Sequence, residues 1–242
     1  MGQKNKFIFG EMKIMKNEPK INFIDIGCSE YLIEPWISYP CNINFILGFD
    51  ISNLIPYKKQ LKIKNISNKI FRKAVFNVSG KKSIHICGKK QNSSLFIPNM
   101  KIIDGYLRRK NNNEERIAKR KKDFKVVKKC TVNCVRLEDV IEKLNVNFDF
   151  IKIDTQGADF QVIKSLGKYL ETQIIGIHTE LFFKEMYKGI VLFDEVDEYL
   201  KERGFYQHKR LGKKNEFSSD FLYLKKENSK KEKIKFIKKI YK

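Results

Sequence analysis

The hydrophobic pattern of this chain alternates between strand-like and helix-like segments. Short apolar runs typical of strands buried in a parallel sheet occur at residues 21–26, 44–50, 148–153 and 174–180. One amphipathic helix is predicted where apolar side chains recur at i, i+3, i+4 and i+7, at Leu137, Val140, Ile141 and Leu144. Another is predicted from Leu192 to Leu200, before the helix-ending Gly204. This alternation predicts an α/β fold with a doubly wound, mostly parallel, Rossmann-like sheet.

Two further strand pairs are predicted from local signals. Residues 70–77 form a third strand, and residues 83–87 form its hairpin partner across a turn that contains Gly80. Near the C-terminus, residues 205–210 and 220–225 flank a polar loop with no helix between them. We therefore expect an antiparallel C-terminal strand pair at one edge of the sheet.

The stretch FDFIKIDTQGADFQVIKSLG, residues 148–167, carries the strongest candidate for chemistry. Its strand delivers Asp154 to the carboxyl end, where the ligand crevice of an open α/β sheet lies. Lys152 shares the strand face of Asp154, because side chains alternate along a strand. The chain then turns at Gly157 and enters a helix whose apolar face is formed by Phe160, Ile163, Leu166 and Leu170.

The chain divides into an N-terminal extension at residues 1–20, one α/β domain at 21–225 and a basic tail at 226–242. A length of 242 residues suits a single domain with a full core. The tail places apolar residues on one helical face among its lysines, at Ile234, Ile237 and Tyr241. Two interpretations are equally favoured: a basic amphipathic helix on an anionic membrane surface, or a frayed terminus.

The net charge of +22 raises the question of nucleic-acid binding, because lysine and arginine neutralise phosphates. Only eight of the fifty basic residues are arginine, the side chain that binds phosphate bidentately. Lysine is abundant in strands and loops alike, so we interpret the surplus as compositional and do not expect a nucleic-acid partner. We interpret the basic stretch at residues 108–129 as a solvent-facing helix or loop, in preference to a lid over an anionic acceptor.

The sequence lacks the patterns that are typical of membrane-spanning, secreted and zinc-binding proteins. No apolar run approaches the ~18 to 20 residues that span a bilayer, and the start of the chain lacks a secretory signal. We expect a cytoplasmic protein, peripheral at the inner membrane face if the tail binds there. The five cysteines form no CxxC pair and only three histidines accompany them, so no metal site is predicted.

The first two predicted strands end in residues suited to binding a nucleoside. The first ends in Asp25-Ile26-Gly27 and the second in Asp50, which lies 23 residues after Gly27. About 20 residues separate the loop glycine from the ribose-binding acid in nucleotide-binding units. Gly27 would let the backbone approach a cofactor, and the Asp50 carboxylate would accept hydrogen bonds from both ribose hydroxyls. Neither GxGxxG nor GxxxxGK[ST] occurs, so a dinucleotide or NTP site is not favoured.

Six sequence blocks occur in the order seen in FkbM-family methyltransferases. They are FIDIG, GFDIS, NSSLFIPN, VRLEDVIEK, DFIKIDTQGADFQVIKSLG and TELFFKEMYKGIVLF. The chain resembles members with a DTQGAE-type motif, and the resemblance covers residues 21–225. It implies a Class I methyltransferase fold, S-adenosylmethionine as cofactor, and methylation of a hydroxyl group on a sugar, surface glycan or secondary metabolite.

The resemblance also implies roles for individual residues. The cofactor would be bound near the ends of the first three strands, by Asp25, Gly27, Cys28, Glu30, Asp50 and Asn77. Asp154 would face the reacting methyl group with Glu180 nearby, so either is a candidate general base, and Lys152 would tune Asp154 if the two pair. Tyr187 would help to shape the acceptor pocket. His178 shares the strand face of Glu180, and we interpret it as structural. A divalent metal held by such carboxylates is compatible with the resemblance, but the sequence does not establish one.

The chain departs from the family in its first loop. DIGCSEY stands where related members carry DIGARGG, so two glycines are missing and Glu30 adds a negative charge near the cofactor's carboxylate. Two alternatives to methylation of a small-molecule or glycan hydroxyl therefore stay open. One is an RNA or protein methyltransferase that uses the basic surface. The other is a non-catalytic binding module that has lost cofactor affinity through this loop.

Overall fold

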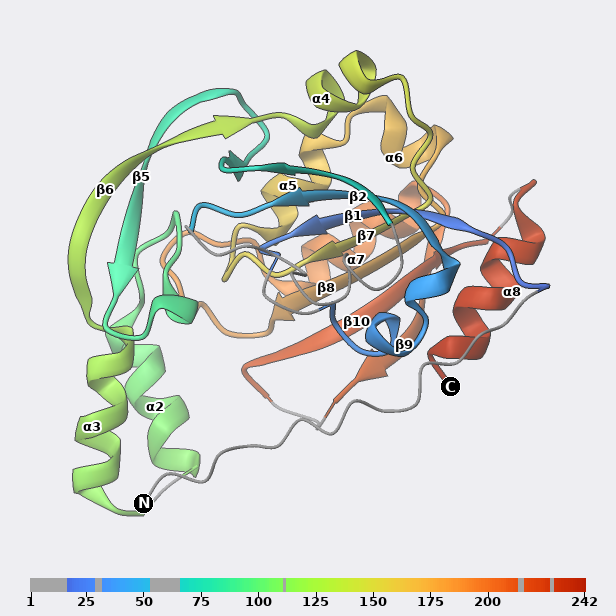
Figure 1. The fold of residues 1–242 in the computed structure, drawn as a ribbon. Helices are drawn as coiled ribbons and strands as arrows, with labels where there is room; N and C mark the ends of the chain where they lie inside the picture. Colours follow the sequence, from blue (N-terminus) through green and yellow to red (C-terminus); the bar gives the residue numbers. More distant parts are fainter. Residues whose placement is uncertain (1–16, 29–31, 53–65, 111, 213–215, 227–228) are drawn as a thin grey trace.

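A seven-stranded sheet forms the centre of the protein in a computed structural model, which describes residues 17–28, 32–52, 66–110, 112–212, 216–226 and 229–242 (Figure 1). The strand order is β3-β2-β1-β7-β8-β10-β9. The strands are β1 (Ile21–Ile26), β2 (Ile43–Phe49), β3 (Ser67–Phe71), β7 (Phe150–Ile153), β8 (Gly176–Phe182), β9 (Phe205–Leu211) and β10 (Ser218–Lys225). The first five are parallel to one another, and β10 runs antiparallel between β8 and β9. The predicted doubly wound sheet with an antiparallel C-terminal pair is confirmed.

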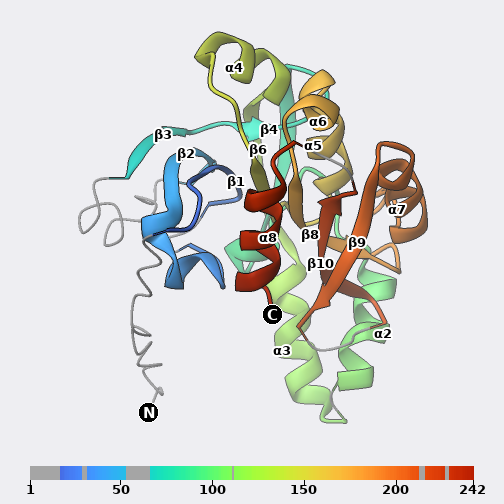
Figure 2. The same cartoon turned by 90° about the vertical axis from the view of Figure 1, so that its right-hand side faces the viewer.

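Helices cover both faces of this sheet (Figures 1 and 2). One face carries α4 (Leu137–Leu144), α5 (Asp159–Ser165), α6 (Lys168–Thr172) and α7 (Phe193–Glu202). The other carries α8 (Lys231–Ile240) and the short 3-10 helices η1 (Trp36–Ser38) and η2 (Pro40–Asn42). Each layer has its own apolar core against the sheet. The parallel strands are therefore buried from both sides, which explains their nearly continuous apolar sequences.

The sequence predicts one long helix after Gly157, but the structure divides it into α5 and α6. Gly167 separates them with a φ of +51°, a left-handed conformation that interrupts a helix. A Cβ at this position would lie 2.2 Å from a carboxylate oxygen of Glu138. The glycine thus lets α4 approach the break closely, and Leu170 still reaches the core from α6.

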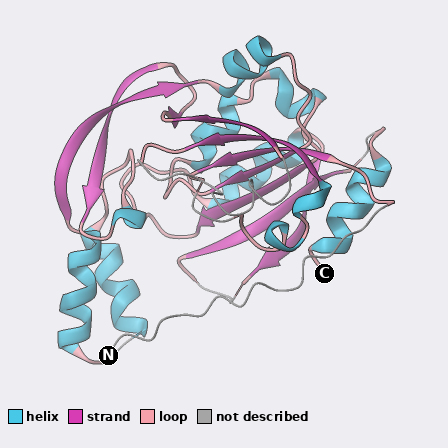
Figure 3. Cartoon of the chain, in the orientation of Figure 1, coloured by secondary structure: helices cyan, strands magenta, loops and turns pink. Residues whose placement is uncertain are grey.

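A second, three-stranded sheet lies beyond the carboxyl ends of the parallel strands (Figures 1 and 3). Its order is β4-β6-β5, with β4 (Ala74–Val75), β5 (Gly80–Cys87) and β6 (Val126–Val135). Between β5 and β6 the chain forms η3 (Lys90–Asn92), α2 (Met100–Lys110) and α3 (Glu114–Phe124). We call residues 80–135 the β5–β6 unit.

The β5–β6 unit corrects two predictions. The expected strand at 70–77 is split, because β3 ends at Phe71 and β4 belongs to the second sheet. Its expected hairpin partner, β5, pairs antiparallel with β6 instead. The basic stretch at 108–129 forms the end of α2, α3 and the start of β6. Its charged side chains are mostly exposed, while the apolar side chains of Ile117 and Phe124 are buried.

The basic tail is part of the folded core and is not frayed. The apolar face of α8 is buried against the sheet through Ile234, Phe236, Ile237 and Ile240. Lys230 and Lys233 pair with Asp149, a fully buried carboxylate just before β7, at 2.8 and 2.7 Å. The face that the membrane interpretation required is therefore occupied by the protein's own core. The boundary expected at residue 225 also falls inside this packed unit.

Candidate active site

From β1 the chain adds β2 and β3 on one side of the sheet, and it later adds β7 and β8 on the other side. β1 and β7 therefore lie next to each other. Such a switch point opens a crevice at the carboxyl ends of the two strands. Gly27 follows β1 and Asp154 follows β7, so both lie at this place. Gly27 has a φ of +72°, and a Cβ there would lie only 2.1 Å from the carbonyl oxygen of Asp154. Only glycine lets the two loops pass this closely.

Three polar side chains form a row across the sheet just below the crevice. Asp25, Lys152 and His178 are direct neighbours on β1, β7 and β8, and all three are buried. Lys152 Nζ lies 3.1 Å from Asp25 Oδ1 and donates a hydrogen bond of 2.8 Å to the carbonyl oxygen of Gly27. Its distance to Asp154 Oδ2 is 4.0 Å. Lys152 therefore pairs chiefly with Asp25 and fixes the loop after β1.

The charge of this buried lysine is maintained by its neighbours. Burial lowers the pKa of Lys152, but the carboxylates of Asp25 and Asp154 outweigh burial and leave the pKa above its ordinary value. The ammonium group thus stays protonated below the crevice. Asp25 and Lys152 both support the crevice from beneath, and Lys152 has only 5 % of its surface exposed.

Asp154 and Glu180 come together at the carboxyl ends of β7 and β8, as the resemblance implied. The side chain of Gln156 joins them, because its Nε2 donates to Asp154 Oδ1 at 3.1 Å and to Glu180 Oε2 at 3.3 Å. Asp154 is exposed, whereas Glu180 is partly buried. Two acidic groups with different solvent access therefore share one amide donor.

The environment of Glu180 favours its protonated form. Burial, and then the negative charges of Asp154, Asp159 and Asp220, raise the pKa of Glu180 to about 8. Burial and the charge of Asp154 likewise raise the pKa of Asp159, in the first turn of α5, to about 7. A carboxyl group that titrates near neutral pH is well suited to accept a proton during a reaction.

Gln156 and Ser94 also belong to the site, although the sequence analysis gave neither residue a role. The single phenolic proton of Tyr187 is shared between two acceptors, Gln156 Oε1 at 2.9 Å and the carbonyl oxygen of Asn92 at 3.1 Å. The hydroxyl of Ser94 donates to the main-chain oxygen of Gln156 at 2.7 Å. Tyr187 was expected to shape an acceptor pocket, but Gln156 and Ser94 were missed. Their link depends on the β5–β6 unit, whose path the sequence did not reveal.

His178 belongs to a buried hydrogen-bond chain. Its Nδ1 lies 2.9 Å from the hydroxyl of Tyr241, which also accepts a bond of 2.9 Å from Trp36 Nε1. His178 Nε2 lies 3.7 Å from Asp220 Oδ1. These contacts connect α8 and η1 to the sheet. The interpretation of His178 as structural agrees with this position.

The described residues that were expected to bind the cofactor follow different strands and differ in exposure. Asp50 follows β2 directly, is partly exposed, and accepts a hydrogen bond from the main-chain N–H of Ser52. Asn77 follows β4, and its Oδ1 is buried with no hydrogen-bond partner among the described residues. Cys28 is buried just after Gly27. Glu30 lies outside the described residues.

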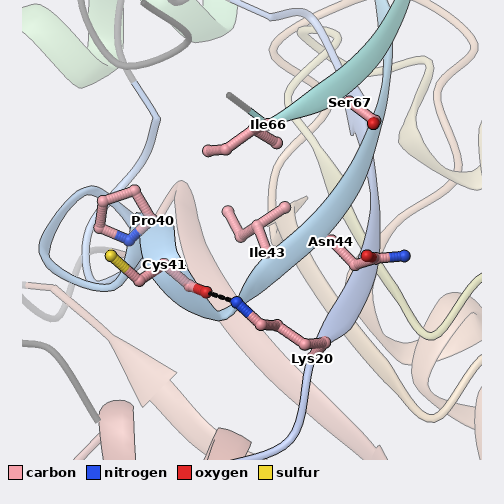
Figure 4. A pocket seen from close by; sticks show the side chains of 7 residues that line it. All are labelled: Lys20, Pro40, Cys41, Ile43, Asn44, Ile66 and Ser67. Atoms are coloured by element: carbon pink, nitrogen blue, oxygen red, sulfur yellow. Dashed lines mark hydrogen bonds between the residues drawn. The ribbon is translucent and has the colours of Figure 1, made fainter. Parts of the chain in front are cut away.

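A pocket of about 270 Å³ lies at the amino ends of the parallel strands, away from the crevice (Figure 4). Its lining comes from the residues at or just before the starts of β1, β2 and β3, including Lys20, Ile43 and Ser67. Lys20 Nζ donates to the main-chain oxygen of Cys41 across it. Ligands of open parallel sheets bind at carboxyl ends, so this pocket is separate from the candidate active site.

Two classes of feature are absent from the part of the chain that the structure describes. No cluster of three or more His, Cys, Asp and Glu side chains is arranged to hold a metal ion. No helix in these same residue ranges is long and apolar enough to cross a membrane.

Comparison with known proteins assigns the chain to a family. The model of the methyltransferase FkbM domain matches residues 25–206, which include both strand ends of the crevice. The chain belongs to the FkbM methyltransferase family. Among curated proteins, none matches this FkbM-family chain in sequence.

The solved structures that match this FkbM-family chain are distant from it in sequence. The magnesium protoporphyrin IX methyltransferase from Synechocystis PCC 6803, with bound SAM, is 10% identical, with a TM-score of 0.41. The match covers 86% of this chain and 72% of that one. The methyltransferase FkbM from Methylobacillus flagellatus KT is 9% identical, with a TM-score of 0.45. That match covers 85% of this chain but 43% of the Methylobacillus chain.

Proposed function

We propose that this FkbM-family protein is an S-adenosylmethionine-dependent O-methyltransferase whose acceptor is a hydroxyl group of a sugar, surface glycan or secondary metabolite. The observation that carries the proposal is the pairing of Asp154 and Glu180 at the switch-point crevice. A hydroxyl group is a weak nucleophile and needs a base as the new bond forms, so carboxyl groups at this place suit O-methylation.

The described residues near the crevice fit S-adenosylmethionine. Asp50 presents a carboxylate that suits the two ribose hydroxyls. The unpartnered buried oxygen of Asn77 suits a donor such as the adenine amine, because buried polar atoms are rarely left unsatisfied. Gly27 keeps the loop after β1 free of a side chain where it crosses β7. When bound, the cofactor supplies an electrophilic methyl group on its sulfonium sulfur.

We assign the base to Glu180 and the orientation of the acceptor to Asp154. Glu180 has a pKa of about 8, so it exchanges a proton near neutral pH, and its neighbour Asp154 is exposed enough to bind an acceptor hydroxyl. Glu180 would take the hydroxyl proton as the oxygen attacks the methyl carbon. Partial burial lowers the polarity around Glu180, which strengthens its interactions with the reacting groups.

Site-directed variants test this assignment. Glu180→Gln and Asp154→Asn keep the shape of each side chain but remove a carboxylate. We expect Glu180→Gln to lower the turnover number by about 10² to 10⁴-fold with unchanged affinity for S-adenosylmethionine. Asp154→Asn should weaken binding of the acceptor more than that of the cofactor. Full turnover in both variants would show that the carboxylates are not the base.

The acceptor is sought by comparing a deletion strain with its parent. Mass spectrometry of surface glycans and small metabolites should reveal a species that is lighter by one CH₂ group in the deletion strain. Methyl transfer to RNA or protein, with RNA binding that weakens steeply as salt is added, would favour the macromolecular alternative instead. Calorimetry with S-adenosylmethionine tests the non-catalytic alternative, since micromolar binding would contradict it.

A further inference from the structure

The backbone of Gln156 is held in an uncommon conformation. Its φ is +54°, in the left-handed region that residues other than glycine and asparagine seldom adopt, and Gly157 follows with a φ of +98°. The hydroxyl of Ser94 donates a hydrogen bond of 2.7 Å to the main-chain oxygen of Gln156. Ser94 is itself buried and paired with His85 of β5. The β5–β6 unit therefore fixes the loop that carries Gln156.

The amide group of Gln156 is oriented by Tyr187. The phenolic O–H donates to Gln156 Oε1 at 2.9 Å, which leaves both N–H groups of Nε2 to face Asp154 and Glu180. The opposite orientation would place the amide oxygen against an oxygen of Asp154 and would leave that carboxylate without the amide donor. Tyr187 keeps its proton, because burial raises its pKa well above the ordinary value.

We propose that Gln156 is a positioning residue for methyl transfer, whose amide holds the carboxyl groups of Asp154 and Glu180 together and favours the ionised form of Glu180. A hydrogen bond donated to a carboxylate stabilises the charged state over the neutral one. The proposal rests on the proposed function only in treating Glu180 as the base. The geometry around Gln156 stands independently of that role.

The amide acts against an otherwise unfavourable electrostatic environment. The charged and titratable groups around Glu180 come from the end of β7, α5, β10 and the segment before α7, and they are Asp154, Asp159, Asp220 and Tyr187. The aspartates oppose ionisation of Glu180, and Lys152 is directed mainly at Asp25. Ser218 and Gln156 supply hydrogen bonds to the carboxyl group. Removing one of these donors should therefore raise the pKa of Glu180 further.

The sharpest test is to withdraw the amide without disturbing the backbone. Gln156→Asn shortens the side chain by one methylene, and asparagine tolerates the left-handed conformation better than glutamine does. Carbon-13 NMR of carboxyl-labelled full-length protein would follow the titration of Glu180, whose signal is identified by its loss in Glu180→Gln. We expect the apparent pKa of Glu180 to rise by about one unit, a tenfold change in the ionisation equilibrium.

A second variant keeps the loop unchanged. Tyr187→Phe retains the ring and removes the donor to Gln156 Oε1, so the amide is free to turn. We expect the apparent pKa of Glu180 to rise in this variant too, but by less than in Gln156→Asn. Tyr106→Phe, on α2 and packed against Phe217, is the matched control and should leave the titration unchanged. An unaltered titration of Glu180 in both Gln156→Asn and Tyr187→Phe would overturn the proposal.

Kinetics separate this proposal from the proposed function. With a methyl acceptor, Gln156→Asn should lower the turnover number about tenfold at neutral pH and recover it at alkaline pH, with the KM for S-adenosylmethionine unchanged. A uniform loss at every pH would mean a purely structural role and would contradict the proposal. Glu180→Gln could retain full turnover while Gln156→Asn still raises the pKa of Glu180 measured by NMR. In that case the assignment of Glu180 as the base fails, and the role of Gln156 in holding the two carboxyl groups stands.

Discussion

Gly27 and Asp154 cross so closely at the switch point that a Cβ on Gly27 would lie 2.1 Å from the Asp154 carbonyl oxygen. The contact joins the loop after β1, which we assign to the cofactor, to the loop that carries Asp154, Gln156 and Gly157. The two strand ends thus meet at one closely packed junction.

We expect Gly27→Ala to disrupt this junction. Its φ of +72° opposes any side chain, and the new Cβ would meet backbone that has no freedom to withdraw. The free energy of unfolding should fall by at least about 2 kcal/mol, measured by urea denaturation. Binding of S-adenosylmethionine should be lost in calorimetry. Gly105→Ala, inside α2 with nothing within 4 Å of its Cβ, is the control and should be neutral or stabilising.

Asp50 is predicted to supply much of the affinity for the ribose. Asp50→Asn keeps the shape of the side chain but replaces one charged acceptor oxygen by a donor. The dissociation constant for S-adenosylmethionine should rise about 10- to 100-fold, as for loss of hydrogen bonds to a charged group. Asp194→Asn, exposed in the first turn of α7, should bind the cofactor like the wild type. Equal affinity in Asp50→Asn and wild type would remove Asp50 from the cofactor site.

The raised pKa of Glu180 predicts a specific pH dependence of stability. In the unfolded chain this group titrates near its ordinary value of 4.5, and in the folded protein near 8. Between these values the folded state holds a proton that the unfolded state has released, so the free energy of unfolding falls as pH rises. Glu180→Gln has no such proton to lose. The variant should therefore gain stability relative to wild type from pH 5 to pH 8.

Urea denaturation at several pH values measures this difference. Asp159, with a pKa of about 7, remains in both proteins and contributes the same trend to each. Glu198→Gln, an exposed substitution on α7, is the matched control and should follow the wild type at every pH. A constant difference between Glu180→Gln and wild type across this range would contradict the raised pKa.

The C-terminal helix is predicted to stabilise the folded protein through its contacts with the sheet and with Asp149. Asp149→Ala would leave the two lysines Lys230 and Lys233 without their buried partner, and should lower the free energy of unfolding by about 3 to 5 kcal/mol. Lys235→Ala, which removes the exposed pair with Glu232 on the same helix, should change it by less than about 1 kcal/mol. Similar stabilities for the two variants would show that α8 is only loosely attached.

The buried hydroxyl of Tyr241 gives an independent test of the same helix. Tyr241→Phe removes the partner of Trp36 Nε1 and His178 Nδ1, and should cost about 1 to 3 kcal/mol in urea denaturation. Tyr206→Phe, on the partly exposed strand β9, should change stability by no more than about 0.5 kcal/mol. An equal effect in both variants would mean that the hydroxyl of Tyr241 adds little.

Local sequence signals predicted the central elements because hydrophobic periodicity and turn residues depend only on residues that are close together in the chain. The range 21–26 was predicted for β1 and is observed without change, since apolar residues buried on both faces leave no other assignment. The helix at α4 follows directly from Leu137, Val140, Ile141 and Leu144. Asp154 was placed at a strand end by the alternation of side chains and by Gly157 after it.

Long-range pairing was the part that local signals did not contain. β5 lies close in sequence to β4, yet it pairs with β6 across the whole of α2 and α3. The tail looked separate because its lysines dominate its composition, while its few apolar residues find their partners in Trp36 and the face of the sheet. Such partners are chosen by the shape of the whole core, which no window of sequence describes.

By itself the sequence determined most strands of the central sheet, the order of the chemical groups along them, and the acids at the ends of β1, β2 and β7. Only the tertiary structure decided that Lys152 pairs with Asp25 beneath the crevice, and that Gln156 joins Asp154 to Glu180. The reason is physical. Periodicity and turn residues act between neighbours in the chain, whereas hydrogen bonds and pKa values depend on groups brought together from β7, β8 and the β5–β6 unit.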